Sequence, residues 1–256
     1  LKNTPFGNTM ITDFALAAVE AEALGDDEYT DFLTVSYSST DYVGHDFGVN
    51  SIELQDTYLR LDLEIERLLN YLDTNVGEGN YSLFLTSDHG AAEVPSFLKD
   101  IDAPGGYVQK NMFTPLYATL KAKYGVSDLI KNISNDQIFL NYDLIKSLQL
   151  DLVDVQEFIV NDIINYSAVS KAYTATTMQT SYFKDGMEKT LQNGYNQKLS
   201  GDVLFTLKSG VIAYGPKGTT HGSGYTYDTH VPLLFYGNGI QKGKTFERTY
   251  VTDIAP

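Results

Sequence analysis

The segment from Tyr81 to Gly90, YSLFLTSDHG, places the strongest limit on what this chain can fold into. It begins as a run of strand-forming residues and ends abruptly at Asp88 and His89. An apolar run that ends in a polar cluster is typical of a buried parallel strand, which delivers side chains to the carboxyl edge of an α/β sheet. A carboxylate beside an imidazole also supplies two ligands suited to a divalent metal such as zinc. For an isolated pair, the alternative is a capping Asp beside a solvated His.

The chain has four histidines, and two of the others also adjoin strand-like runs. His45 lies four residues after Asp41, beyond the predicted strand 31–38, and His230 opens the apolar run 231–236. An Asp–His pair at this spacing shares one face if the segment is helical, although a helix cap beside a surface His is the alternative. A fold that aligns the three strands would gather these ligand types into one patch.

His221 lies in a stretch with four glycines, residues 215–224. The stretch is not a P-loop, because the GK[ST] ending is missing. Ser223 is not a nucleophile elbow, because the strand-to-helix context is absent. His221 therefore either supports a metal ligand or contacts substrate, or it only holds the loop, and the residues favour the last interpretation.

The rest of the pattern predicts an α/β fold. Residues 51–71 carry apolar side chains at three- and four-residue spacing, which predicts a helix, and residues 9–24 predict another before Gly25. The strand 31–38, the helix 51–71 and the strand 81–86 then form one βαβ unit, whose strands are expected to be parallel.

The alternation breaks down over residues 104–200, which contain no histidine. We interpret this span as an α+β insertion that shapes the rim of the site and contributes no metal ligand. The domain prediction is therefore an α/β core over 1–103, the insertion over 104–200 and the continued core over 201–256. Within these spans, we expect helices at 113–123, 152–164 and 186–199, a short strand at 138–141, and a core sheet that resumes at 203–207 and 211–214.

Composition sets outer limits on function. A chain of 256 residues that is 43% hydrophobic can bury a sizeable core. Its formal net charge of −15 argues against nucleic-acid binding, and it repels a phosphate ester unless bound cations reverse the local field. The absence of cysteine leaves only nitrogen and oxygen ligands for a metal. No apolar run approaches the ~18 residues of a membrane span.

Three segments, STDYVGHDFGVNS, FLTSDHG and YDTHVPLLFYG, resemble the zinc-binding segments of the alkaline phosphatase superfamily. They are most similar to the periplasmic, phosphate-irrepressible alkaline phosphatases, which are related to type I phosphodiesterase/nucleotide pyrophosphatases. The resemblance runs from TPFGNTMITDFA to TDIAP and is weakest over 104–200. Those relatives generally read FGPNS and TADHG where this chain has Val49 and Ser87, and neither change removes a ligand.

The resemblance implies a mostly parallel sheet with flanking helices and a site for two zinc ions. Asp41, His45 and His230 resemble the ligands of one zinc, and Asp88 and His89 resemble two ligands of the other. In the family, the second zinc also takes an Asp and a nucleophilic Thr or Ser from an amino-terminal half, which has no counterpart here. The resemblance therefore implies a carboxy-terminal portion that lacks the nucleophile and is inactive alone.

The function expected from this resemblance is zinc-dependent hydrolysis of phosphate monoesters. The alternatives are a phosphodiesterase or nucleotide pyrophosphatase, and a metal-binding domain that is catalytically silent. The expected partners are a small phosphate ester and the missing amino-terminal half, with no nucleic acid and no membrane span. The resemblance also implies a periplasmic or secreted location.

Overall fold

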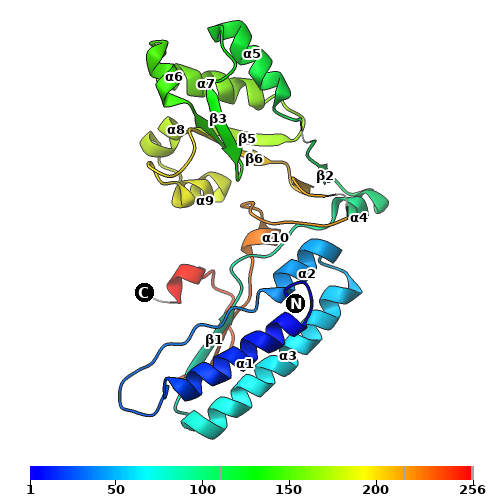
Figure 1. The fold of residues 1–256 in the computed structure, drawn as a ribbon, viewed down its shortest axis with the longest axis vertical. Helices are drawn as coiled ribbons and strands as arrows, with labels where there is room; N and C mark the ends of the chain where they lie inside the picture. Colours follow the sequence, from blue (N-terminus) through cyan, green and yellow to red (C-terminus); the bar gives the residue numbers. More distant parts are fainter. Residues whose placement is uncertain (110, 216, 255–256) are drawn as a thin grey trace. The chain divides into compact units, whose positions relative to one another are not determined.

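The computed structural model describes residues 1–109, 111–215 and 217–254, and the chain forms two compact units (Figure 1). Unit 1 contains Leu1–Val94, Lys217–Thr220 and His230–Pro256, and unit 2 contains Pro95–Pro216 and His221–Thr229. The boundaries of these units differ from the predicted domain boundaries. Residues 201–212, for example, belong to the same unit as the predicted insertion over 104–200. The domain boundaries themselves stay a prediction.

Three helices form much of unit 1: α1 (Phe6–Ala21), α2 (Ser39–Phe47) and α3 (Ile52–Leu72). Figure 1 shows α1 and α3 lying alongside each other. Ser51 caps α3, since its hydroxyl accepts a hydrogen bond from the Leu54 amide at 3.1 Å. The helices predicted over 9–24 and 51–71 are confirmed. A π-helical turn (Asp73–Gly77) follows α3, and a 3-10 turn (Val251–Asp253) lies near the carboxyl end.

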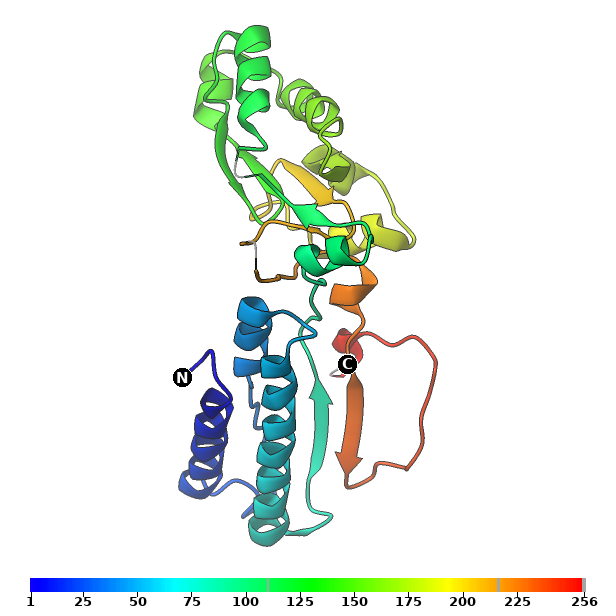
Figure 2. The ribbon, with the colours of Figure 1, turned by 90° about the vertical axis from the view of Figure 1, so that its right-hand side faces the viewer.

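The strands of unit 1 are β1 (Ser82–Thr86) and β8 (Leu233–Gly237), which run side by side and antiparallel (Figure 2). Residues 31–38 do not form a strand, so the predicted parallel βαβ unit is wrong for the described structure. The reason is that a strand needs a hydrogen-bonded neighbour. This segment instead touches β1 through stacked rings, Phe32 and Phe84, whose centroids are 6.4 Å apart.

Unit 2 is built on an antiparallel sheet of four strands in the order β3-β4-β6-β5. The helix α7 packs on β5 and β6, and its Val155, Ile159 and Ile163 are fully buried at four-residue spacing. Each such side chain contributes about 1.5–3 kcal/mol of burial free energy. The strands are β3 (Ile130–Ser134), β4 (Gln137–Leu140), β5 (Val169–Thr174) and β6 (Val203–Leu207), and the helices are α5 (Thr114–Tyr124), α6 (Tyr142–Ser147), α7 (Leu152–Ile163), α8 (Ala175–Thr180) and α9 (Gly186–Gly194).

Shorter elements complete unit 2. The helix α4 (Pro95–Asp100) precedes β2 (Gly106–Tyr107), which pairs in parallel with β7 (Val211–Ile212). The last helix, α10 (Thr226–Thr229), follows the glycine-rich stretch. No helix among the described residues is long and apolar enough to cross a membrane.

The α/β class, with mixed sheets and flanking helices, is confirmed. Within the described residues, however, parallel pairing is limited to β2 and β7, and β6 lies between β4 and β5 rather than in a resumed core sheet. A buried apolar run fits a central antiparallel strand as well as a parallel strand. The apolar sequence of residues 203–207 therefore does not indicate whether their pairing is parallel or antiparallel. The two-residue turn Asn135–Asp136 returns the chain from β3 to β4, with φ of 51° and 57°.

The turn Asn135–Asp136 should make the stability of the chain depend on pH. Burial raises the pKa of Asp136 from 3.8 to about 6, so the folded chain holds this proton more tightly than the unfolded chain. The contribution of Asp136 to stability therefore falls as pH rises from about 4 to 6. We expect Asp136→Asn to raise the free energy of unfolding at pH 8 by about 1–3 kcal/mol, with no gain at pH 4.

Urea denaturation at the two pH values measures this difference. Asn also tolerates a left-handed backbone, so the turn itself is preserved. The matched control is Asp100→Asn, which removes an exposed carboxylate from the same unit. An equal gain for Asp136→Asn at both pH values would show that the charge of Asp136 is not the cause.

Candidate metal centre

The helix α2 carries Asp41 in its first turn and His45 in its last. The two side chains lie on one face, with 3.4 Å between Asp41 Oδ1 and His45 Nε2, and they are 37% and 19% exposed. An acid near the start of a helix suits the helix dipole. One short helix thus presents a carboxylate oxygen and an imidazole nitrogen to the same point.

Neighbouring residues of unit 1 hold α2 in place. The buried side chain of Asn8, on α1, accepts a hydrogen bond from the Ser39 amide at 3.2 Å, which caps the start of α2. At the other end, Gly48 has φ of +96°, a conformation that favours glycine, and a Cβ there would strike the side chain of Val94. Both ends of the ligand-bearing helix are therefore fixed.

The imidazole of His45 is oriented by the segment 217–220. His45 Nδ1 lies 2.7 Å from the carbonyl oxygen of Thr219, and the Thr219 amide donates back to the carbonyl of His45 at 3.2 Å. A carbonyl can only accept, so Nδ1 carries the proton of the neutral ring, and Nε2, the atom beside Asp41, carries the lone pair. This is the usual way in which a protein prepares a His for a metal.

Thr219 was missed by the sequence analysis. It is fully buried, its hydroxyl donates to the carbonyl of Ala92 at 2.5 Å, and the Ala92 amide donates to Thr220 at 3.1 Å. The segment is thus fixed to both the α2 region and the residues after His89. No sequence motif marks Thr219, and its only signal is its place two residues before His221.

Asp88 and His89 follow the end of β1 with Ser87 between, as the sequence predicted. His89 Nε2 lies 3.5 Å from Asp88 Oδ2, and His89 Nδ1 lies 2.8 Å from the Gly90 carbonyl oxygen. Because that carbonyl can only accept, Nδ1 carries the proton of the neutral ring and Nε2 carries the lone pair. The side chain of Asp88 is 85% exposed and that of His89 is 26% exposed. The pair offers a second carboxylate and imidazole to a cation.

His230 is not brought to the pair on α2. It is exposed and precedes β8, whose Leu233 pairs with Thr86 at the end of β1 that leads to Asp88. Among the described residues, no group of three potential ligands with atoms within 4.8 Å of one another includes His230. The assignment of His230 as the third ligand stays a prediction.

Comparison with known proteins agrees with the resemblance seen in the motifs. Residues 3–231 match the family model described as type I phosphodiesterase / nucleotide pyrophosphatase. Over its whole length, the chain is 40% identical to alkaline phosphatase PafA of Elizabethkingia meningoseptica and 41% identical to alkaline phosphatase PhoV of Synechococcus elongatus, covering 47% and 46% of those proteins. It is also 42% identical to a Myroides odoratus protein named calcium-transporting ATPase, of which it covers 48%.

The structural comparison gives the same result. The crystal structure of wild-type PafA matches all of this chain with a TM-score of 0.94 at 40% identity, and 49% of the PafA chain is covered. The chain thus spans about half the length of the relatives that it matches. Since the family model covers most of its residues, the chain belongs to the type I phosphodiesterase/nucleotide pyrophosphatase family.

Proposed function

We propose that this chain is the metal-binding part of a zinc-dependent phosphate monoester hydrolase of the alkaline phosphatase type. The observation that carries the proposal is the hydrogen bond between His45 Nδ1 and the Thr219 carbonyl, which directs Nε2 to the side of Asp41. Two relatives named as alkaline phosphatases, PafA and PhoV, support the monoester reaction. A chain without cysteine needs nitrogen and oxygen ligands, and Asp and His supply them.

The first zinc is assigned to Asp41, His45 and one further histidine. The resemblance assigns His230 as that histidine, and the substitutions below test it against His221. Residues 217–220 are held against His45 and Ala92 by four hydrogen bonds, which keep the His45 ring in place. Three protein ligands leave a coordination position open, as catalytic zinc sites do.

The second zinc is assigned to Asp88 and His89. These two residues supply an incomplete set, so further ligands and the nucleophile are expected from a polypeptide other than this one. When bound, the two cations would supply Lewis-acid stabilisation of the attacking and leaving oxygens. They would also offset the net charge of −15, which otherwise repels a phosphate ester.

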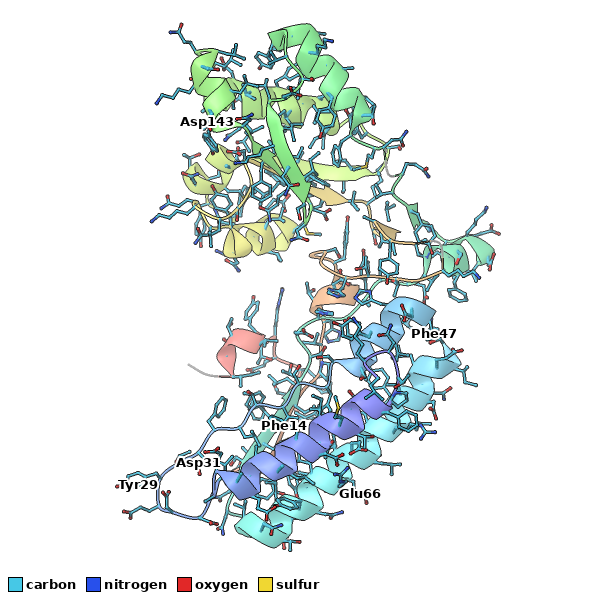
Figure 3. All side chains as sticks on the ribbon, in the orientation of Figure 1. Phe14, Tyr29, Asp31, Phe47, Glu66 and Asp143 are labelled. Carbon is cyan, nitrogen blue, oxygen red and sulfur yellow. The ribbon has the colours of Figure 1, made fainter. Side chains whose placement is uncertain are left out.

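Exposed apolar side chains on unit 1 support the need for a second polypeptide. On α1, Phe6, Met10 and Phe14 recur every four residues and are 59%, 53% and 76% exposed. The side chain of Phe14 is labelled in Figure 3. On α3, Leu59 and Leu63 are 63% and 62% exposed. Apolar strips of this kind mark contact surfaces, so we assign them to the half of the relatives' length that this chain does not cover.

Two other functions stay as alternatives. The family name includes phosphodiesterases and nucleotide pyrophosphatases, so diester cleavage is the second candidate. A metal-binding domain without activity is the third. A periplasmic or secreted location is part of the proposal, and it rests on the family resemblance.

The ligand assignment predicts how single substitutions change zinc binding. We expect His45→Ala and His230→Ala each to weaken zinc affinity by about 10-fold or more, because each removes a nitrogen ligand. His221→Ala, the matched control, should keep the affinity within about threefold, because the proposal gives His221 no ligand role. Competition with a chromophoric chelator measures all three values. The reverse order for His221 and His230 would overturn the assignment of His230.

The proposal also predicts whether this chain hydrolyses phosphate esters by itself. The chain alone should not hydrolyse an aryl phosphate, because it lacks a nucleophile and a complete second metal site, and such losses are far from additive. Mixing it with the part of PafA that it does not cover should give zinc-dependent turnover of p-nitrophenyl phosphate above that of bis-p-nitrophenyl phosphate. A preference for the diester would favour the phosphodiesterase alternative, and turnover by the chain alone would refute the need for a partner.

A further inference from the structure

We propose that residues 31–37 are an unpaired strand, to which the second polypeptide adds a neighbouring strand through backbone hydrogen bonds. The partner is the half of the PafA chain that this chain does not cover. The inference rests on the proposed need for a second polypeptide, and it adds where and how that polypeptide binds. Residues 31–37 belong to unit 1, and the inference concerns that unit alone.

Residues 31–37, DFLTVSY, have the sequence and the exposure pattern of a strand. The segment is rich in aromatic and β-branched residues, which favour strands. Exposure alternates along its second half: the side chains of Val35 and Tyr37 are half-buried, whereas those of Thr34 and Ser36 are exposed. Alternation with a period of two is the pattern of a strand that packs on one face. The segment therefore has two distinct faces without belonging to a sheet.

The backbone in the middle of this segment has no partner. Among the described residues, none makes a hydrogen bond to a backbone amide or carbonyl of residues 32–36. Every residue there has both a donor and an acceptor, which a neighbouring strand would pair. A row of unpaired backbone groups is a template for a strand from another chain, and such addition takes its affinity from main-chain hydrogen bonds.

Both ends of the segment are held in place. The carboxylate of Asp31, which is labelled in Figure 3, accepts a hydrogen bond from the Gly25 amide at 2.7 Å. At the other end, the Tyr37 hydroxyl lies 3.2 Å from the hydroxyl of Thr12 on α1. The Tyr37 carbonyl also accepts a hydrogen bond from the Thr40 hydroxyl at 2.9 Å. A segment that is fixed at both ends loses less conformational freedom when it pairs, which favours binding.

The strands beside this segment are also uncovered. The ring of Phe32 stacks on that of Phe84 in β1, and β1 and β8 form a ribbon of two strands, which is marginally stable by itself. Phe84 pairs with Phe235, and the next pair, on the opposite face, is Leu85 with Leu234. These four side chains are 37–53% exposed. Apolar side chains on both faces of a ribbon are typical of a larger sheet that is covered on both sides.

The uncovered half of PafA is the occupant that the charge and the chain lengths favour. This chain matches PafA over its whole length but covers only 49% of it, so about half of the PafA chain lies outside the match. A second copy of this chain is the alternative occupant. Two copies would each carry a net charge of −15, and their repulsion opposes association.

Proline substitutions test the pairing when the whole chain is co-expressed with the uncovered part of PafA. Neighbouring amides of a strand point to opposite edges, so Thr34→Pro and Val35→Pro are made separately. Proline removes the amide donor and is excluded from the interior of a sheet. We expect at least one of the two variants to lower the recovery of the complex by about 10-fold or more. The matched controls Thr34→Ala and Val35→Ala keep the amide and should stay within about threefold of the original chain.

Hydrogen exchange without zinc tests the same pairing in the original chain. The amides of residues 32–36 should exchange fast in the chain alone, because they have no partner in its described part. In the complex, alternate amides of this segment should exchange about 10-fold more slowly or less, because a strand pairs every second amide at one edge. The amides within α3 are the control, since their helical hydrogen bonds are present in both samples. This measurement needs no assumption about the metal ligands.

The outcomes separate this inference from the proposed function. A complex that hydrolyses p-nitrophenyl phosphate while the amides of residues 32–36 stay fast would overturn the strand pairing alone. Slowed amides in a complex without zinc-dependent turnover would support the pairing and count against the proposed function.

Three further results would overturn the inference. Equal loss of the complex in the proline and alanine variants would show that side chains, not backbone amides, make the contact. Slow exchange in the chain alone that depends on its concentration would identify a second copy as the occupant. Failure of the two polypeptides to form a complex would overturn the second polypeptide and the pairing together.

Discussion

The site depends on the double hydrogen bond between Thr219 and His45. Thr219 accepts from the His45 ring and donates to the His45 backbone, so one residue fixes both the tautomer and the position of the ring. Because Thr219 is buried and its hydroxyl also bonds to Ala92, the contact does not rely on exposed side chains. A ligand helix of nine residues, too short to be stable alone, is thereby held in a single arrangement.

Local patterns predicted the local structure well. The helix over 51–71 was evident from its apolar spacing, and the four-residue step from Asp41 to His45 placed both on one face once that segment was helical. The position of Asp88 and His89 after a strand was equally evident. Each of these features is decided within a few residues, so a single sequence contains the information.

Strand pairing could not be predicted in the same way. The runs at 81–86 and 203–207 are both apolar. In the described part of the chain, however, β1 pairs with β8 alone and is largely exposed, whereas β6 is buried between two neighbours. An apolar sequence indicates that a strand can be buried, but it does not indicate which segment of the fold buries it. The exposure of Phe84 and Phe235 fits the proposal that exposed apolar residues of unit 1 form the contact surface for a second polypeptide. His230 precedes β8, so its position depends on the same kind of pairing.

Two buried aspartates show that the residue type alone does not reveal the role of a side chain. Asp202 is 5% exposed and accepts hydrogen bonds at both oxygens, from the Leu140 amide at one and from Tyr142 and Gln156 at the other. Asp228, in α10, is 4% exposed and accepts hydrogen bonds from the Ser223 amide and hydroxyl at one oxygen, Oδ2. Its other oxygen is buried and has no hydrogen-bond partner within the described part of the chain. A carboxylate that is satisfied at both oxygens stabilises the sheet around it, whereas one with an unpaired buried oxygen carries a desolvation cost. The two residues are identical in type, so only their partners in the fold distinguish them.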